Sequence, residues 1–245
     1  NGNANDESGN GNDGTVNGAT LATDRNGESG KAYSFDGDGD SIISNEIVAS
    51  YESFTVLLWF KTDSEGVLIT NSSDGNLSSG MGDKRIYINS TGLVFSGIYN
   101  SGVHSISSDT SYADNNWHHA VLKQDAENLS LYVDGVWKGK KSVESQEVSN
   151  KWWGIGYSHL IGDWPDRPNN NYFKGTVDDI RIYNRALSEA EVAALYELEK
   201  PKAKPGDLLW EFQLGGGASS SPAIGSDGTV YIGTENNKLV AVNPD

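Results

Sequence analysis

Residues 175–188, GTVDDIRIYNRALS, decide the fold of this chain, and the sequence EAEVAALYELEK follows them directly. The apolar residues of this stretch predict a strand over residues 177–183. Ser188 and Glu191 have the spacing of a capping box, in which two side chains satisfy backbone donors at the start of a helix. Three residues beyond the cap share one helical face: Val192, Leu195 and Tyr196. The stretch therefore predicts a strand that leads into a short, capped helix.

The composition narrows the class of protein. The 245-residue chain has a formal net charge of −16, 29 glycines and 10% aromatic residues. This mixture suits many short strands joined by tight turns. A protein that binds nucleic acid needs clustered Lys and Arg, so the acidity argues against nucleic acid and against anionic membranes. It fits a soluble extracellular protein and is compatible with calcium-binding carboxylates.

The chain contains no cysteine, which excludes a disulfide scaffold and thiol chemistry. In a secreted protein, this absence favours a bacterial source. No apolar run approaches the length of a membrane span, so we expect no membrane insertion. The sequence has no signal peptide and begins abruptly in a polar segment, from which we expect a processed or truncated piece of a larger protein.

Short strand-like segments recur along most of the chain and indicate a β-sandwich or barrel. Residues 54–60 are continuously apolar, as in a strand that is covered on both faces. Asp134 and Gly135 predict a tight hairpin turn. Residues 1–30 are rich in Gly, Asn and Asp and are predicted to be loop. We predict strands at residues 32–35, 41–43, 54–61, 67–70, 85–89, 93–98, 118–123, 129–133 and 177–183.

The composition changes at residues 199–206, where Lys and Pro alternate in EKPKAKPG. Such a sequence resists both helix and sheet, which predicts a linker. Residues 207–245 then carry a second cluster of strand patterns, which resembles one blade of a PQQ-like β-propeller. A single blade has too small a core to be stable alone, so it belongs to a larger parent protein or packs on something else.

Five motifs in order give residues 1–198 a specific resemblance. They are the loop at residues 5–14, YSFDG at 33–37, WHHAV at 117–121, LYVDG at 131–135 and the terminal strand. Together they resemble the LamG-like domains of the concanavalin A-like lectin/glucanase superfamily. The resemblance implies an all-β fold, a two-sheet antiparallel jelly-roll sandwich with one short C-terminal helix. The strand cluster after the linker adds a small β-hairpin appendage.

One departure from the family pattern concerns the beginning of the chain. In this family an apolar strand normally precedes the loop at residues 5–14, and here the chain begins after it. A missing strand would leave an unpaired sheet edge. We predict that residues 208–214, or a strand from a neighbouring subunit, fill that edge by β-augmentation.

The resemblance also implies a structural calcium ion. Calcium prefers six to eight oxygen ligands from carboxylates, amides and backbone carbonyls in Gly-rich loops. The implied ligands are Asp6, Asn10 and Asn12 in the N-terminal loop and Asp178 on the last strand. The alternative is a solvated loop of Asx turns that binds no metal. Residues 36–40, DGDGD, begin like an EF-hand but lack its Gly and its bidentate Glu, so we predict a hairpin turn with solvated carboxylates.

The sequence argues against catalysis. Glucanases of the superfamily carry a Glu-x-Asp-x-x-Glu strand that places two carboxylates on one face, and no such spacing occurs here. His118 and His119 are adjacent on a predicted strand, so their side chains point to opposite faces and cannot share a metal. No nucleophile elbow, zinc spacing or phosphate loop occurs. We therefore predict that the chain is not an enzyme.

Sugars are bound by aromatic faces with polar groups beside them, and the segment around Trp164 offers both. An exposed Trp on a Pro-stiffened loop would lose little entropy on binding. The alternative is that Trp164 packs over the edge of the sandwich. The candidate carbohydrate-binding residues are Trp164, Asp166, Arg167, Asn169, Trp153 and Tyr157. The secondary candidates on strands are Arg85, Tyr87, Tyr99 and His104.

The sequence thus predicts a calcium-stabilised, non-catalytic carbohydrate-binding or adhesion module of a multidomain bacterial protein. We expect it to be secreted or on the cell surface and to bind a polysaccharide or glycoconjugate. The alternative is a structural or assembly subunit whose sandwich is completed by strand exchange with a neighbouring chain or by the C-terminal segment.

Overall fold

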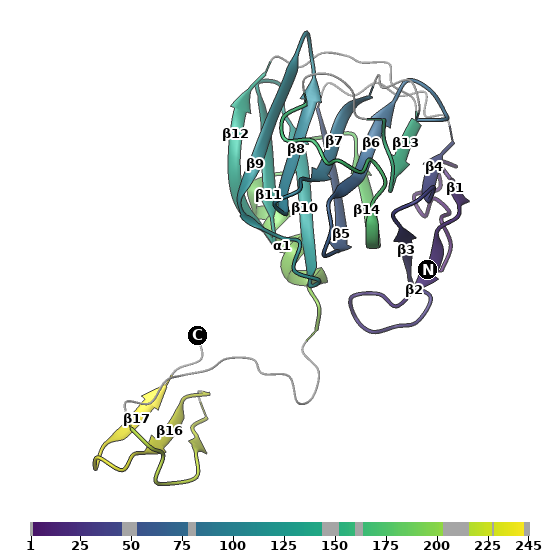
Figure 1. Ribbon diagram of the computed structural model, residues 1–245. Coiled ribbons are helices and arrows are strands. Elements are labelled where there is room, and N and C mark those ends of the chain that lie inside the picture. Colours follow the sequence, from purple (N-terminus) through teal and green to yellow (C-terminus); the bar gives the residue numbers. More distant parts are fainter. Residues whose placement is uncertain are drawn as a thin grey trace. The chain divides into compact units, whose positions relative to one another are not determined.

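The computed structural model describes residues 2–45, 53–77, 82–143, 152–159, 164–202, 216–226 and 228–242. The chain divides into two compact units, Asn1–Pro201 and Lys202–Asp245. The first unit holds two large antiparallel sheets and one helix, and the second holds a small sheet (Figure 1). Each unit is described by itself.

Two seven-stranded antiparallel sheets form the sandwich of the first unit (Figure 1). Sheet A has the order β1 (Gly14–Asn17), β4 (Ser41–Ser44), β13 (Trp152–Ile155), β6 (Gly66–Ser72), β7 (Gly82–Ile88), β8 (Leu93–Tyr99) and β9 (Val103–Ser111). Sheet B has the order β12 (Val136–Ser142), β11 (Asn128–Val133), β10 (Trp117–Gln124), β5 (Phe54–Lys61), β14 (Lys174–Tyr183), β3 (Ala32–Asp36) and β2 (Thr20–Ala22). This arrangement confirms the predicted all-β, two-sheet sandwich.

The core lies between the sheets, and β5 shows how one strand serves two surfaces. Alternate residues of a strand point to opposite faces. Val56, Leu58 and Phe60 lie in the main core, whereas Leu57 joins a smaller cluster with Val192 of the helix. All residues of β5 except Lys61 are buried, so the predicted double coverage of this strand is confirmed.

Helix α1 (Glu189–Glu199) covers the outer face of sheet B and begins with the predicted capping box. The Glu191 backbone N–H donates to Ser188 Oγ at 3.2 Å, and the Ser188 N–H donates to Glu191 Oε2 at 2.8 Å. Tyr196 stacks on Trp59 with ring centroids 5.7 Å apart. Glu199, which we assigned to the linker, is instead the last helical residue and is buried.

The N-terminal region differs from its prediction as loop, because residues 14–17 and 20–22 form β1 and β2. Strands β9 and β13 were also missed. β1 is largely exposed and pairs through its backbone with β4, so it leaves no apolar pattern to recognise. β1 and β2 are edge strands of the two sheets. The segment predicted to complete an edge, residues 208–214, lies outside the described residues.

The acidic turn at residues 36–40 was wrongly predicted as a hairpin. Its flanking strands, β3 and β4, belong to different sheets, so the turn carries the chain across the sandwich. Asp40 is buried rather than solvated, and its Oδ2 accepts a hydrogen bond from the Asp36 N–H at 2.9 Å. The carboxylate stabilises this crossing because it satisfies a backbone donor.

The described part of the second unit contains three antiparallel strands where we predicted a hairpin. They are β15 (Ala223–Ile224), β16 (Val230–Gly233) and β17 (Leu239–Val242), with β16 in the middle. Their side chains are half-buried or exposed. The resemblance to a PQQ-like blade stays a prediction.

Candidate functional site

Trp164, the predicted sugar-stacking residue, is buried with only 5% of its surface exposed. It packs with Val67, Tyr87 and Phe95 on the outer face of sheet A. The Arg85 guanidinium lies 4.7 Å from the centroid of its indole ring. The prediction of an exposed Trp164 is therefore wrong, and the alternative, packing over the sandwich, is what the structure has.

Two neighbours explain why the loop folds back onto sheet A. Gly97 on β8 leaves room for the indole, since a Cβ atom there would lie 2.9 Å from the Trp164 ring. The Tyr87 hydroxyl donates to the Pro165 carbonyl at 2.5 Å. Burial lowers the pKa of Arg85 to about 10, because the charged guanidinium loses hydration. A glycine inside a strand was the one sequence signal for this close approach.

The other predicted sugar-binding residues differ in their exposure and in their neighbours. Asp166 and Arg167 are exposed, and the exposed Asn169 amide donates to Glu65 Oε2 at 3.2 Å. Trp153 is buried in the main core. The half-buried Tyr157 stacks on Tyr172, with ring centroids 4.3 Å apart. Of the secondary candidates, Arg85 and Tyr87 are buried, His104 is half-buried and Tyr99 is exposed.

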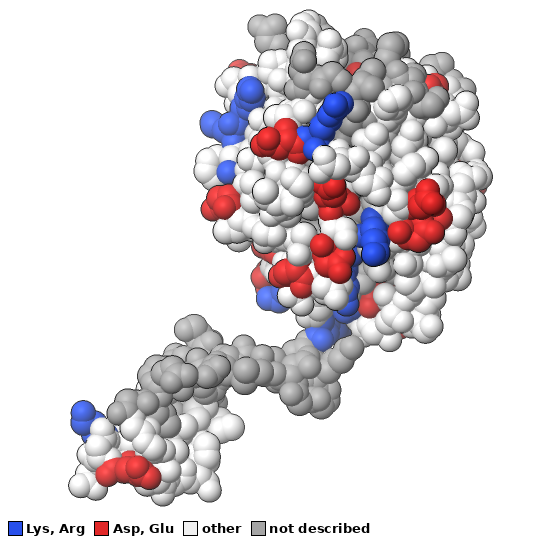
Figure 2. Space-filling view, in the orientation of Figure 1, with Lys and Arg blue, Asp and Glu red and all other residues white. Residues whose placement is uncertain are grey.

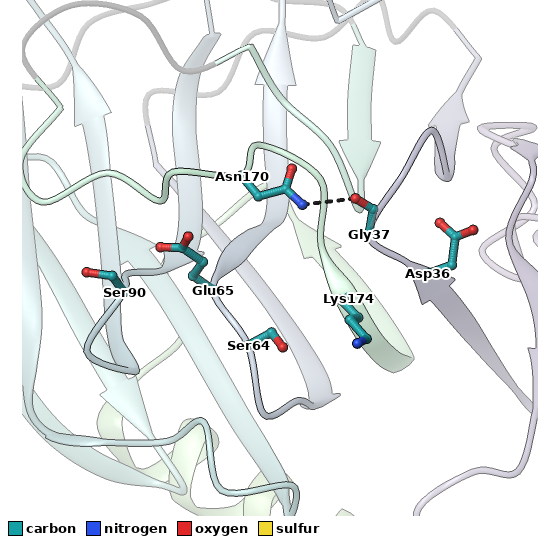
Figure 3. A pocket seen from close by; sticks show the side chains of 7 residues that line it. All are labelled: Asp36, Gly37, Ser64, Glu65, Ser90, Asn170 and Lys174. Atoms are coloured by element: carbon teal, nitrogen blue, oxygen red, sulfur yellow. Dashed lines mark hydrogen bonds between the residues drawn. The ribbon is translucent and has the colours of Figure 1, made fainter.

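A polar groove of about 440 Å³ lies beside the loop that carries Asn170 (Figure 3). We call it the Glu65 groove. Its walls come from the end of β3, the turns that follow β5 and β7, and the start of β14. The lining residues are Asp36, Gly37, Ser64, Glu65, Ser90, Asn170 and Lys174. None of these residues was predicted as a site residue, because they come from four segments that are far apart in the chain: residues 36–37, 64–65, 90 and 170–174.

Hydrogen bonds between and within its segments hold the walls of the Glu65 groove in place. The Asn170 amide donates to the Gly37 carbonyl at 2.9 Å, as drawn in Figure 3, and accepts from the Tyr172 N–H at 3.0 Å. Gly37 has φ +89°, a left-handed conformation that other L-residues rarely adopt, and a Cβ there would lie 3.1 Å from the Lys174 Cβ. The turn that carries Asp36 therefore requires this glycine.

The chemistry of the Glu65 groove suits a ligand rich in hydroxyl groups. Asp36 and Glu65 offer carboxylate acceptors, and Lys174 offers an ammonium donor. Ser64 and Ser90 can both donate and accept. Among the described residues no aromatic side chain lines this groove, so it would bind through hydrogen bonds and not through ring stacking.

The four implied calcium ligands have different hydrogen-bond partners in this structure. Asp6 Oδ2 accepts the Asn12 N–H at 2.9 Å within the N-terminal loop. Asp178, in contrast, bonds to the Arg25 guanidinium at 2.5 Å with both side chains buried. Because Arg25 already neutralises Asp178, that carboxylate is not available as a calcium anchor. The described residues contain no group of three or more His, Cys, Asp or Glu that could hold a metal ion.

His118 and His119 point to opposite faces, as predicted. His118 bonds to Asp134 and Asp114 at 2.8 and 2.9 Å. His119 is fully buried on the other side, 5.0 Å from Trp59 between ring centroids. Burial lowers the pKa of His119 to about 4, so it is neutral near pH 7.

Figure 2 shows acidic and basic groups interspersed on the face of the molecule that it draws. Within the described part of the chain, no helix is long and apolar enough to cross a membrane.

Comparison with solved structures finds the same fold in several proteins. Domain 4 of AbnA, a GH43 extracellular arabinanase from Geobacillus stearothermophilus solved with arabinotriose, has a TM-score of 0.61 and 20% identity, covering 79% of this chain and 93% of that one. The botulinum neurotoxin type G receptor-binding domain has a TM-score of 0.57 and 16% identity, covering 79% of this chain and 48% of that one. A SAP-like pentraxin of Limulus polyphemus has a TM-score of 0.53 and 16% identity, covering 68% of this chain and 82% of that one.

Comparison with curated protein sequences gives no significant match. The sequence model described as Laminin_G_3, concanavalin A-like lectin/glucanases superfamily, matches residues 35–193, which hold most of the sandwich. The chain therefore belongs to the Laminin_G_3 family of the concanavalin A-like lectin/glucanases superfamily.

Proposed function

We propose that the sandwich is a non-catalytic carbohydrate-binding or adhesion module of a secreted, multidomain bacterial protein. The observation that carries this proposal is the Glu65 groove, which gathers carboxylates, hydroxyls, an amide and an ammonium group at one open surface. Such a set matches the alternating donors and acceptors of a saccharide. The fold is shared with an arabinanase domain solved with arabinotriose and with toxin receptor-binding domains, which supports a binding role.

The non-catalytic part of the proposal rests on the sequence. A retaining glycosidase needs two carboxylates about 5 Å apart across the scissile bond. The Glu-x-Asp-x-x-Glu strand that supplies them in the glucanases is missing from this chain. Incubation with the polysaccharides that bind, followed by a reducing-sugar assay, tests this part directly: release of reducing ends would contradict it.

Polysaccharide binding is tested by affinity electrophoresis and calorimetry with a panel that includes arabinan. We expect at least one polysaccharide to bind, and Glu65→Ala to weaken that binding about tenfold, as loss of a hydrogen bond to a charged group predicts. The matched control is Glu28→Ala, which removes the same charge from an exposed turn. Equal binding by Glu65→Ala and the wild type would show that the polysaccharide does not bind in the Glu65 groove.

A structural or assembly role is the second candidate, and the edges of the sheets favour it. The edge strands β1 and β2 expose Val16 (36%) and Leu21 (52%). Exposed apolar edges are open to pairing with another strand. Light scattering after size-exclusion chromatography separates the candidates. A polymer that does not dissociate on dilution and binds no polysaccharide would favour assembly.

We retain calcium as a proposal for the N-terminal loop alone, with Asp6, Asn10 and Asn12 as the ligands. Hydrogen bonds from Ser8 and Asn12 lower the pKa of Asp6, so its carboxylate is charged and suited to a cation. The test is the melting temperature with calcium and with EDTA. An unchanged melting temperature would count against a structural ion.

A further inference from the structure

A second groove, of about 520 Å³, lies on the outer face of sheet B next to the start of α1. We call it the Trp137 groove. Trp137 is 52% exposed, whereas Trp59, Trp153 and Trp164 are all buried. The lining residues are Lys123, Asp125, Asn128, Ser130, Trp137, Lys140 and Glu189. An exposed indole bordered by polar groups is unusual for a side chain that normally packs in a core.

A β-bulge places the aromatic and basic residues on the same face. Residues three apart on a regular strand point to opposite sides. Here the register between β11 and β12 shifts at Leu131/Tyr132, so that Trp137 lies opposite Tyr132 and Lys140 lies opposite Ser130. The extra residue brings Trp137 and Lys140 to the groove together. A bulge that re-aims side chains in this way is a feature commonly found beside functional sites.

The floor of the Trp137 groove is held rigidly. Lys123 Nζ donates to the Leu187 carbonyl at 2.9 Å and lies 5.6 Å from the Tyr132 ring centroid. Asp125 Oδ1 accepts the backbone N–H groups of Glu127 and Asn128 at 2.9 and 2.8 Å. These contacts fix the surface before any ligand arrives, which lowers the entropy lost on binding.

The charges lining the Trp137 groove balance, with two lysines against Asp125 and Glu189. An anionic ligand would also meet the repulsion of a chain with a net charge of −16. The groove therefore favours an uncharged ligand. Its combination of one flat apolar surface with amide, hydroxyl and charged hydrogen-bonding groups fits a molecule with one apolar face and a polar rim.

We propose that the Trp137 groove binds a neutral pyranose unit of a glycan, with the ring face of the sugar on Trp137. Asn128, Ser130, Lys140 and Glu189 then take its hydroxyl groups. This site shares only its ligand class with the proposed function, because it lies apart from the Glu65 groove. Gln124 pairs with Phe54 and Trp117 pairs with Lys61, so the two grooves lie at opposite ends of β5 and β10. The sandwich thus offers two glycan sites.

The test is a titration of protein labelled with ¹⁵N in its tryptophan indoles. The probes are cellohexaose, laminarihexaose and β-1,4-mannohexaose, and the Trp137 indole signal is assigned by its loss in Trp137→Phe. We expect a saturable shift of that signal with at least one probe. In calorimetry, Trp137→Ala should weaken the same binding about tenfold, which corresponds to about 1.4 kcal/mol. The matched control, Leu198→Ala, removes another exposed apolar side chain and should bind normally.

The outcomes separate this site from the Glu65 groove. A Trp137 shift that persists in Glu65→Ala supports an independent second site. Two results would overturn the proposal: no shift of the Trp137 signal with any of the three probes, or a concentration-dependent dimer that Trp137→Ala abolishes. The second result would assign Trp137 to self-association. Circular dichroism of each variant checks that the fold is retained.

Discussion

Replacement of Arg25 by methionine is the sharpest test of how this sandwich is held together. Arg25 Nη1 bonds to Asp178 at 2.5 Å, Nη2 bonds to Asp179 at 2.7 Å and Nε donates to the Glu199 carbonyl at 2.6 Å. The guanidinium also lies 5.1 Å from the Trp59 ring centroid. One side chain from the N-terminal region therefore joins β14 to the C-terminal end of α1.

The expected loss of stability follows from the burial of the Arg25–Asp178 ion pair. The side chains of Arg25 and Asp178 are only 6% and 5% exposed, so Arg25→Met leaves a buried carboxylate without its cation. Breaking a buried pair in this way costs about 3–5 kcal/mol. The bond to Asp179, whose side chain is 43% exposed, adds at most about 1 kcal/mol because solvent screens it. We expect Arg25→Met to lower the free energy of unfolding by about 3–5 kcal/mol.

The double variant Arg25→Met/Asp178→Asn tests whether the unpaired charge of Asp178 causes this loss of stability. It removes the stranded charge, so we expect it to regain most of the lost stability.

The stability lost in Arg25→Met should also depend on pH. Desolvation raises the pKa of Asp178, an effect that the charge of Arg25 opposes, so without Arg25 the pKa rises further. A folded-state pKa above the unfolded value means stability that is present at low pH and lost as pH rises, so the deficit of Arg25→Met should be larger at pH 7 than at pH 4.

Urea unfolding at both pH values, followed by tryptophan fluorescence, measures these differences when the slope m is unchanged. A loss below about 1 kcal/mol at pH 7 would show that the pair is effectively solvated. A double variant no more stable than Arg25→Met would show that the stranded charge is not the cause.

Three further predictions concern the stability of the sandwich and its helix. Trp164→Ala should lower the free energy of unfolding by about 3–5 kcal/mol, because it leaves a cavity over Tyr87 and Phe95; near wild-type stability in urea would contradict the burial of Trp164. His119→Phe should reduce the pH dependence of stability. The pKa of His119 is lowered to about 4 in the fold, so its contribution is present above the unfolded value of 6.5 and is lost as pH falls toward 4; equal urea midpoint profiles for variant and wild type over that range would refute this. Ser188→Ala should cost about 1 kcal/mol through loss of the helix cap, and an unchanged melting temperature would show that the capping box contributes nothing.

Several elements were predictable because their signals are local. The continuously apolar strand β5 has the predicted bounds, and the Ser188–Glu191 box begins α1 as expected. The Asp134-Gly135 turn joins β11 to β12, with both residues at positive φ. β1 and β2 were missed because short edge strands are held by backbone pairing and carry no distinctive side-chain pattern.

The candidate sites were harder to predict because each depends on distant neighbours. Trp164 looked exposed beside its polar neighbours, but Gly97 and Arg85 on other strands supply the space and the cation that cover it. Trp137 looked like an ordinary hairpin residue, and a bulge together with the start of α1 makes it the wall of a groove. Both outcomes reverse the local expectation for a tryptophan.

The sequence alone determined the β-sandwich class, the capped helix after the last strand and the absence of thiol chemistry, since periodicity, caps and composition are local properties. Only the tertiary structure decided the partner of Asp178, which is Arg25 at a separation of 153 residues. It also decided which tryptophans are covered. The physical reason is that burial and charge pairing depend on which strands the two sheets bring together, and residues adjacent in the chain do not encode that contact.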